Sequence, residues 1–465
     1  MMKKALATLL LCAGTLFPAA AQQLIPQFKA GDRVALIGDS ITHGGHYHSY
    51  IWLYYMTRFP DMPLILMNCG VGGDTAADML LRLDYDVFSK EPTYITLTFG
   101  MNDTGYMDVY NKDNSAELAD ERVASSIDNY GKIVEALKTK APDATVVMIG
   151  GSPYDETSTF NDAVLHDKNA AICRIVDAQK DTAAALGWGF VDFNAPMVEL
   201  SKKLQETDPR YSFCPADRIH PDKDGQMVMA YEFLKAQGLA GKKVADIRIN
   251  AKRKKAELSE NCAISGIKAG AGALEFDYLA KSLPYPCDSI SEHGWGNIHS
   301  QRDALKIIPF TEEFNREDLC VTGLKDGTWL LSIDGQPIAD FTAAELAEGI
   351  NMAEFTTTPQ YRQASAVMYL NEERLEIDKR LREYVWIEFN SFKGTDQIFV
   401  DDWKSIDVVK ERAKTDWFMA SSAYWYSKSY YPEIRALWKK YADDIVNEIY
   451  RINKPVSRHI TLRML

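Results

Sequence analysis

The sequence predicts an α/β fold: a three-layer α/β/α sandwich on a parallel sheet, followed by a smaller α+β extension. In the first half of the chain, short apolar runs alternate with longer amphipathic stretches. Strands that alternate with helices in this way pair in parallel. After about Ile247 the alternation stops, and turn-rich segments and two long helical patterns follow. The length of 465 residues also exceeds what one core usually serves, so we expect at least two domains.

The N-terminus has the pattern of a cleavable signal peptide. Lys3 and Lys4 precede an apolar run that ends in small residues, which is the order of segments in export signals. We expect residues 1–21 to be removed by a cut after Ala21, and the mature protein to be secreted or periplasmic. Cys12 opens the alternative of a lipid anchor, which the preceding Leu11 disfavours because lipoprotein signals normally have a small residue there.

Charge and cysteine content exclude several classes of function. A net charge of −13 argues against a nucleic-acid partner and against docking on an anionic membrane. No stretch after the signal approaches the ~18 consecutive apolar residues of a transmembrane helix, so we expect no membrane insertion. The cysteines lack the spacing of metal ligands. Cys262 and Cys287 either form a disulfide or, like the others, serve as small buried hydrophobes.

Five apolar runs in the first half predict the strands of the parallel sheet. The runs are Arg33–Gly38, Pro63–Cys69, Thr93–Gly100, Ala144–Gly150 and Gly187–Phe193. The amphipathic stretches predict helices over Thr75–Phe88, Ser115–Lys138, Asn161–Leu186 and Asp224–Ala236. Because ligands bind at the carboxyl ends of the strands in such sheets, functional residues should follow the strands closely.

The second half predicts a small β unit and a helical hairpin. The basic run Lys252–Lys255 indicates a linker, so we place the first domain at 24–245 and an accessory region at 256–465. The accessory region is predicted to be β-rich over about 256–342 and helical over about 343–455. The segment Cys320–Phe341 predicts a β-meander, because Lys325–Gly327 and Asp334–Gly335 supply turn residues between apolar runs.

Helix signals follow the predicted meander. Thr342 and Glu345 have the spacing of an N-cap and its capping box. Apolar residues at three- and four-residue intervals predict a long helix from Tyr361 to about Phe389. A second helix is predicted from Pro432, a residue that suits the first helical position.

A serine follows the first predicted strand in a sharp turn. The sequence Gly38-Asp39-Ser40 places a hydroxyl at the carboxyl end of that strand. This segment is not the G-x-S-x-G elbow of α/β-hydrolases, which the chain lacks. Asp39 is interpreted as structural, bonding to nearby backbone amides. On its own the Gly-Asp-Ser triplet is weak evidence for a nucleophile, because such triplets are also common in turns.

Three further segments strengthen the interpretation of Ser40 as a nucleophile. A glycine-rich block, 68–75, follows the second strand and contains Gly73. The block 100–103 follows the third strand and contains Asn102. The block 217–221 precedes the last helix of the domain and contains Asp217 and His220. With these four ordered blocks, residues 31–240 resemble the SGNH hydrolase superfamily of GDSL-type esterases and lipases.

The resemblance implies a flavodoxin-like fold and a role for each block. Ser40 would be the nucleophile, His220 its base, and Asp217 the carboxylate that orients the imidazole. The backbone N–H groups of Ser40 and Gly73 and the side-chain amide of Asn102 would form the oxyanion hole. Residue 42, a threonine, departs from the GDSL ending, and Cys69 and Met101 are unusual neighbours within their blocks, which leaves the mechanism untouched.

The residue types suit these roles. Asp217 and His220 are close enough for one carboxylate to fix the imidazole tautomer. Pro221 disfavours helical dihedrals at His220 and so keeps it in a loop. Asn102 is a neutral donor, and a glycine at position 73 lets the backbone approach a substrate.

Two clusters carry open alternatives. His43, His46 and His48 could hold Zn²⁺, but no carboxylate or thiol completes such a site in the sequence. We therefore expect no metal and no cofactor, and interpret His43 and His46 as candidates for the substrate pocket, or else as supporting packing. The aromatic segments 424–426 and 430–431 could stack on sugar rings or belong to a core.

The sequence therefore predicts an exported serine esterase that hydrolyses short O-acyl esters, chiefly acetyl. The sequence contains no long apolar segment that could form a lid over a lipid chain. This absence, together with the substrates of exported members of the superfamily, favours an acylated polysaccharide as substrate. A lipid or thioester hydrolase of the same fold is one alternative, and a non-catalytic glycan-binding protein is another. The expected partner is an acylated carbohydrate or another small ester substrate, and the sequence does not identify a protein partner.

Overall fold

The computed structural model describes residues 24–270, 272–291 and 298–465, and the expected signal peptide, residues 1–21, lies outside them. The predicted three-layer sandwich is present. A five-stranded parallel sheet has the order β2-β1-β3-β4-β5, which is the flavodoxin-like order. Its strands are β1 (Arg33–Gly38), β2 (Ile65–Gly70), β3 (Tyr94–Leu97), β4 (Thr145–Gly150) and β5 (Gly189–Asp192). All five predicted strands are confirmed within a few residues.

Helices cover both faces of this sheet. They are α1 (Ser40–Gly44), α2 (His46–Arg58), α3 (Ala76–Arg82), α4 (Met107–Tyr110), α5 (Ser115–Lys140), α6 (Lys168–Leu186), α7 (Asn194–Gln205) and α8 (Lys223–Ala236). Strand β1 shows why its sequence is a continuous apolar run. Val34 and Leu36 join the core beneath α2 and α8, whereas Ala35 and Ile37 join the core beneath α3, α5 and α6. Both faces are buried, as expected for a parallel sheet.

Two features of this layer differ from the prediction. The helix expected from Asn161 begins only at Lys168, because the Asn161 side chain accepts a hydrogen bond from the Ala163 backbone and Asp167 adopts a left-handed φ of 67°. The segment expected to be one helix over Thr75–Phe88 is α3 followed by a π-helical turn (Leu83–Val87) and a 3-10 turn (Phe88–Lys90).

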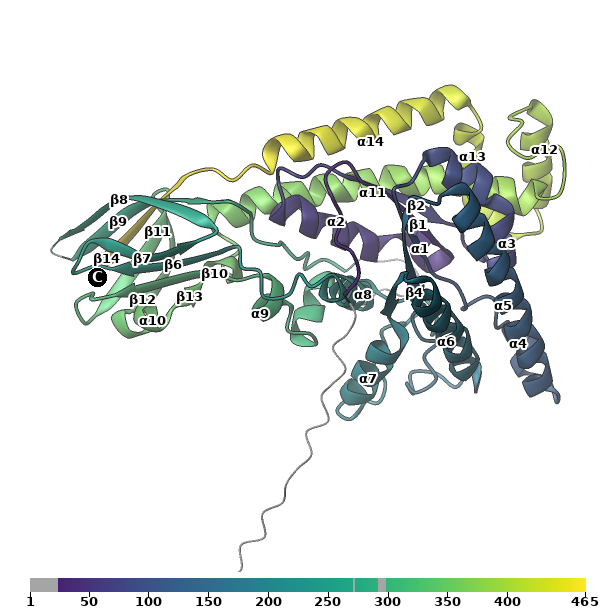
Figure 1. Cartoon of the computed structure of the whole chain (residues 1–465), viewed down its shortest axis with the longest axis horizontal. Coiled ribbons are helices and arrows are strands. Elements are labelled where there is room, and N and C mark those ends of the chain that lie inside the picture. Colours follow the sequence, from purple (N-terminus) through teal and green to yellow (C-terminus); the bar gives the residue numbers. More distant parts are fainter. Residues whose placement is uncertain (1–23, 271, 292–297) are drawn as a thin grey trace, which may run out of the picture.

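The β unit is a two-sheet sandwich. Its strands are β6 (Ala245–Asn250), β7 (Lys255–Glu260), β8 (Cys262–Gly270), β9 (Ala273–Ala280), β10 (Glu317–Thr322), β11 (Thr328–Ile333), β12 (Gln336–Thr342), β13 (Ile350–Asn351) and β14 (Arg458–Met464). One sheet has the order β13-β10-β6-β7 and the other β12-β11-β14-β9-β8. Apolar residues of both sheets form one core between them. Figure 1 shows this sandwich at the end of the molecule away from the parallel sheet.

The predicted β-meander is wrong in one of its two turns. Asp334–Gly335 closes the hairpin between β11 and β12 as expected, with φ values of 53° and 78°. Lys325–Gly327 instead crosses from one sheet to the other, because β10 pairs with β6 and not with β11. The basic run Lys252–Lys255 is likewise not a linker but the turn between β6 and β7. Its charges face solvent.

The remaining helices lie between strands of the sandwich along the chain. They are α9 (Phe310–Phe314), α10 (Ala343–Glu348), α11 (Pro359–Phe392), α12 (Trp403–Arg412), α13 (Trp417–Ser429) and α14 (Pro432–Ile452), with 3-10 turns at Gln301–Lys306 and Met352–Glu354. The capping box of α10 is confirmed, since Glu345 accepts from the Thr342 backbone at 2.7 Å and Thr342 accepts from the Glu345 backbone at 3.2 Å. The predicted helical hairpin is α11 and α14, with α12 and α13 inserted between them.

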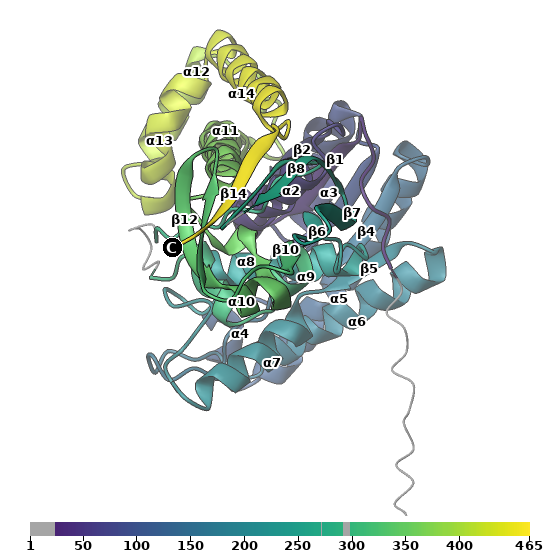
Figure 2. The same cartoon turned by 90° about the vertical axis from the view of Figure 1, so that its left-hand side faces the viewer.

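Helix α11 connects the two ends of the molecule. Figure 1 shows it running from the sandwich past α2 toward the edge of the parallel sheet, with α14 above it. Figure 2 shows the sandwich in front, with α12, α13 and α14 on one side and α5, α6 and α7 on the other. The last strand, β14, then returns the chain to the sandwich, where it lies between β9 and β11.

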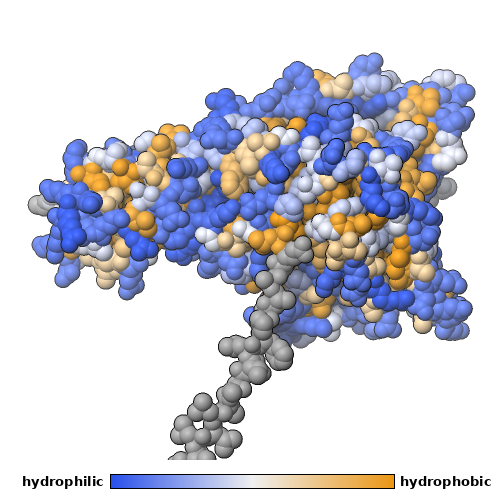
Figure 3. Space-filling model, in the orientation of Figure 1, coloured by the Kyte–Doolittle hydropathy of each residue, from blue (hydrophilic) through white to orange (hydrophobic). Residues whose placement is uncertain are grey.

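Three further features of the fold are the distribution of apolar side chains on its surface, the apolar character of its helices and the state of its cysteines. On the face drawn in Figure 3, hydrophilic side chains predominate over the sandwich, and apolar ones are more frequent over the α/β body. Among the described residues, no helix has the length and apolar character needed to cross a membrane. The six described cysteines are free. The alternative in which Cys262 and Cys287 form a disulfide is therefore wrong.

Candidate active site

Ser40 lies directly beyond the carboxyl end of β1. Gly38 ends the strand, and Ser40 is the first residue of α1. A side chain at position 38 would bring its Cβ to 2.1 Å from the Thr42 hydroxyl, so only glycine fits this turn. Asp39 caps α1 by accepting a hydrogen bond from the Ile41 backbone at 3.0 Å, as predicted for a structural role.

His220 faces Ser40 across the top of the sheet. Its Nε2 lies 2.7 Å from the Ser40 hydroxyl, and its Nδ1 lies 2.6 Å from Asp217 Oδ2. The other oxygen of Asp217 accepts hydrogen bonds from the backbone N–H groups of Ile219 and His220, both at 2.9 Å. The carboxylate is thereby fixed in place, with one oxygen left to hold the imidazole.

Arg218 anchors the loop that carries these two residues. Its backbone φ of 68° turns the chain sharply between Asp217 and His220. Its guanidinium is buried and donates to the carbonyl oxygens of Asp155 and Ser158, each at 3.0 Å. The Arg218 side chain therefore fixes this loop to the segment 155–158. The position of Arg218 within the block 217–221 did not indicate this role.

The electrostatics of the Ser40–His220–Asp217 set favour a strong base. Burial alone would lower the pKa of His220, but the hydrogen bond and charge of Asp217, with the charge of Asp39, outweigh it and raise that pKa. Burial would raise the pKa of Asp217, but its bonds to His220 and to the loop amides lower it. Asp217 thus stays ionised when His220 accepts a proton.

Gly73 and Asn102 follow the strands on either side of β1. Gly73 has a φ of +85°, which favours glycine, and no atom lies within 4 Å of the position a Cβ would take. Asn102 donates from Nδ2 to the Asp74 carbonyl at 3.0 Å, which joins its block to the glycine-rich block. Because β2, β1 and β3 are adjacent and parallel, these two residues and Ser40 share one edge of the sheet.

Asn102 is oriented by Tyr106, a residue just outside the sequence block that contains Asn102. The Tyr106 hydroxyl donates to Asn102 Oδ1 at 2.7 Å. This bond fixes which end of the amide is the donor. Because Asp74 takes one Nδ2–H and Tyr106 occupies Oδ1, the second Nδ2–H is left for another acceptor.

A buried lysine holds the loop beneath Asn102. Lys168 is fully buried, and its Nζ lies 2.7 Å from the Met101 carbonyl, 2.8 Å from the Thr104 hydroxyl and 2.6 Å from the Gly105 carbonyl. It also lies 4.1 Å from the centre of the Tyr106 ring. Burial lowers the pKa of Lys168 to about 7. Nothing in the sequence signalled this contact between the start of α6 and a loop more than sixty residues earlier.

Helix α11 braces the glycine-rich block from the other side. Trp386 donates from its indole N–H to the Gly72 carbonyl at 2.9 Å. Arg382 donates to the Gly70 carbonyl at 2.9 Å and holds both oxygens of Asp86, at 2.6 and 2.7 Å. The accessory region therefore contacts the candidate site directly. The helical periodicity of this segment predicted the helix but not its target.

The three histidines after Ser40 have different surroundings. His43 accepts from the Gly72 backbone at Nδ1, 3.2 Å, and its Nε2 lies 3.7 Å from Glu383. Burial, helped by the charge of Arg382, lowers the pKa of His43 to about 3, so it is neutral. His48 is buried and lies 3.2 Å from the Thr42 carbonyl. His46 is half-buried, with its ring 5.9 Å from that of Tyr50. A substrate contact for His43 and His46 stays a prediction.

The described residues contain one group with the composition of a metal site. Ligand atoms of Asp222, Asp224 and His299 lie within 4.8 Å of one another. The carboxylates already have donors: Asp222 accepts from the backbones of Ile298 and His299 at 2.7 and 2.8 Å, and Asp224 accepts from the Tyr211 hydroxyl at 2.6 Å. These contacts fasten the segment around His299 to the start of α8.

The aromatic segments are partly core and partly surface. Trp52, Tyr54 and Tyr55 of α2 are buried in the main core. Tyr426 is fully buried, whereas Tyr424 is 60% exposed. Tyr426 therefore belongs to a core, and sugar stacking by exposed members such as Tyr424 stays a prediction.

Two family models, a solved structure and a bacterial esterase are similar to this chain. The family model described as GDSL-like Lipase/Acylhydrolase matches residues 36–228, and the model of the Diltiazem deacetylase C-terminal helical domain matches residues 365–454. The solved structure of BT4096, a gut microbial diltiazem-metabolizing enzyme, is 48% identical in sequence. It superposes with a TM-score of 0.92 over 96% of this chain and 100% of that one. An acetylxylan esterase from Geobacillus stearothermophilus is 23% identical over 224 residues, 45% of this chain and 95% of that protein.

Proposed function

Because the chain belongs to the GDSL-like lipase/acylhydrolase family and is a carboxylic ester hydrolase, we propose that it removes short acyl groups, chiefly acetyl, from hydroxyl groups of extracellular substrates. The observation that carries the catalytic part is the pair of contacts at His220, 2.7 Å to Ser40 and 2.6 Å to Asp217. Through these contacts His220 can take the proton of Ser40 while Asp217 orients the imidazole, as acyl transfer by a serine requires.

The reaction proceeds through an acyl-enzyme. Ser40 Oγ attacks the ester carbonyl while His220 Nε2 takes its proton, and Asp217 stabilises the imidazolium that forms. The tetrahedral intermediate collapses, the alcohol leaves with the proton from His220, and the acyl group stays on Ser40. Water then attacks the acyl-enzyme with His220 again as base, which releases the carboxylic acid and frees Ser40.

The developing oxyanion needs fixed donors, and three groups suit this role. They are the backbone N–H groups of Ser40 and Gly73 and the free Nδ2–H of Asn102. The bonds from Tyr106 and to Asp74 support the assignment of Asn102, because they set its donor end before a substrate arrives. Replacing Asn102 by alanine should lower turnover ~10²–10³-fold, and a near-normal rate would refute this role.

The acyl group is proposed to be small on the strength of two relatives. One is an acetylxylan esterase, and the helical-domain model that matches 365–454 takes its name from a diltiazem deacetylase. An acetylated polysaccharide is the natural substrate we favour, as the sequence alone suggested. The identity of 48% to a diltiazem-metabolizing enzyme favours a second candidate, an acetylated drug-like alcohol. The same identity argues against a non-catalytic glycan-binding protein.

Export is part of the proposal. The charged, apolar and small-residue order of residues 1–21 supports it. The test is N-terminal sequencing of the protein from the extracellular or periplasmic fraction, where the mature chain should begin at Gln22. An uncut N-terminus on protein that stays in the cytoplasm would refute it.

Acyl-chain length separates the proposed activity from lipid hydrolysis. The protein should hydrolyse p-nitrophenyl acetate and fail on the octanoate ester, and Ser40→Ala should abolish the acetate reaction. Acetate release from acetylated xylan and from diltiazem then distinguishes the two candidate substrates. Preference for the octanoate ester would favour the lipid hydrolase instead.

A further inference from the structure

A separate cavity lies at the end of α2 that is far from Ser40. It has a volume of about 590 Å³. It is lined by the last turn of α2, the segment 59–62, the residues just before β6, and those at the ends of β7 and β9. Helix α2 begins six residues after Ser40 and has 13 residues, so it spans about 20 Å. The cavity is therefore not part of the esterase site.

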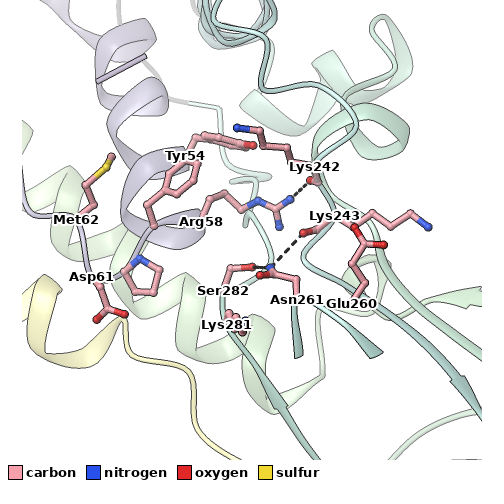
Figure 4. A pocket seen from close by; sticks show the side chains of 12 residues that line it. Tyr54, Arg58, Asp61, Met62, Lys242, Lys243, Glu260, Asn261, Lys281 and Ser282 are labelled. Atoms are coloured by element: carbon pink, nitrogen blue, oxygen red, sulfur yellow. Dashed lines mark hydrogen bonds between the residues drawn. The ribbon is translucent and has the colours of Figure 1, made fainter. Parts of the chain in front are cut away.

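An arginine at the cavity has a buried guanidinium group with no carboxylate partner. Arg58 is only 7% exposed. Its Nη2 donates to the Lys242 carbonyl oxygen, and Figure 4 shows this contact among the lining residues. Its Nη1 is buried without a hydrogen bond, and among the described residues no carboxylate is within ion-pair distance of it, although the buried Glu317 interacts electrostatically with it from further away. A buried guanidinium group that makes no direct ion pair costs free energy, which a bound anion would offset.

Two other charged residues of the lining are already neutralised. Lys243 lies 2.6 Å from Asp246 and 2.9 Å from Asp318. Asp61 pairs with Lys454 at 2.7 Å. Both of these lining charges are therefore already paired and are not available to a ligand.

The charges that remain are mostly positive. Lys242 and Lys281 are exposed at the cavity and, like Arg58, have no carboxylate partner among the described residues. Of the two lining carboxylates, Glu260 has no cationic partner in the part of the chain that the structure describes. The cavity thus holds an excess of positive charge in a chain whose net charge is −13. Such a local reversal of sign favours an anionic ligand.

The walls of the cavity are fixed before any ligand binds. Asn261 donates from Nδ2 to the Val244 carbonyl at 2.8 Å and to the Ser282 hydroxyl at 3.1 Å. The Leu283 backbone donates to the Thr57 carbonyl at 2.8 Å, which ties the sandwich to the end of α2. Preformed walls reduce the ordering cost of binding.

We propose that this cavity binds an acidic sugar, with the sugar carboxylate on Arg58 and the cationic rim of Lys242 and Lys281. A guanidinium group pairs well with a planar carboxylate. The volume is within the range of small-ligand sites, which is roughly 300–1,000 Å³. The half-buried ring of Phe59, also in the lining, provides an aromatic surface for the sugar ring. The proposal stands on this cavity alone and does not depend on the esterase reaction.

Calorimetric titration of the full protein at low salt tests the proposal. D-glucuronate should bind with a stoichiometry of one, inorganic sulfate roughly tenfold more weakly because it has no ring, and D-glucose not at all. Arg58→Gln should weaken glucuronate binding roughly tenfold or more, and the exposed Lys281→Gln about threefold. The matched control is Arg253→Gln, since Arg253 is 76% exposed in the β6–β7 turn and outside the lining.

Several outcomes would overturn the proposal. They are the absence of glucuronate binding at millimolar concentration, sulfate affinity equal to that of glucuronate, and equal binding of glucose. Arg58 is buried, so its variant must first give a native circular dichroism spectrum. If it does not, Lys281→Gln decides, and binding unchanged from that of Arg253→Gln would refute the site.

Discussion

The Nε2 atom of His220 lies 2.7 Å from the Ser40 hydroxyl, although 180 residues separate the two in the sequence. The parallel sheet makes this contact possible. Ser40 follows β1, and the loop of His220 leads into α8, which packs against α2 on one face of the sheet. Asp217 then sets the imidazole so that its free nitrogen faces the hydroxyl.

Asp217 is expected to act through the tautomer and basicity of His220. Asp217→Asn keeps the shape but allows the amide to stabilise the wrong tautomer, so kcat should fall ~10³–10⁴-fold. Because Asp217 raises the pKa of His220, the acid limb of kcat/KM should also move to lower pH in this variant. A wild-type pH profile with Asp217→Asn would contradict the role.

The wild-type pH profile follows from the state of His220. The base must be neutral, so kcat/KM should rise with pH as the imidazole loses its proton. Since the pKa of His220 is raised above its ordinary value of 6.5, the midpoint should lie above 6.5. Stopped assays with p-nitrophenyl acetate in a series of overlapping buffers measure it, and a midpoint below 6 would be inconsistent with the paired Asp217.

Tyr106 is expected to be a positioning residue for Asn102. Tyr106→Phe removes one hydrogen bond, worth about 1 kcal/mol, so kcat should fall roughly fivefold while KM stays within error. In an Asn102→Ala background the same change should have no further effect, because its target is gone. Tyr85→Phe, at a 60% exposed position, is the matched control. Additive losses in the double variant would show that Tyr106 acts elsewhere.

Trp386 is expected to keep the glycine-rich block in position from outside the α/β domain. Trp386→Phe removes its bond to the Gly72 carbonyl, which should lower kcat about 3- to 10-fold with little change in KM or stability. Trp403→Phe on α12, a residue 67% exposed, should leave kcat unchanged. Equal activity of the two variants would remove any role for α11 in the reaction.

The site residues were predictable because each is encoded in a short block at the end of a predicted element. Ser40, Gly73 and Asn102 follow strands, Asp217 and His220 precede α8, and the structure places Ser40 and His220 in contact. The parallel sheet was equally accessible, since runs such as Arg33–Gly38 are buried on both faces and so lack polar alternation.

The support of the site was not predictable from local pattern. Lys168 and Trp386 act on loops that are distant in sequence, and a lone lysine or tryptophan on a helix gives no indication of its target. The sandwich shows the same limit. Strand β14 at the end of the chain separates β9 from β11, so the pairing of Cys320–Phe341 depends on residues outside that segment.

Covalent labelling of Ser40 tests the central claim most directly. A fluorophosphonate probe should add once, to the peptide that contains Ser40, as read by mass spectrometry. The adduct should be absent in Ser40→Ala and form far more slowly in His220→Ala. Labelling of another residue, or full-rate labelling without the imidazole of His220, would contradict the account.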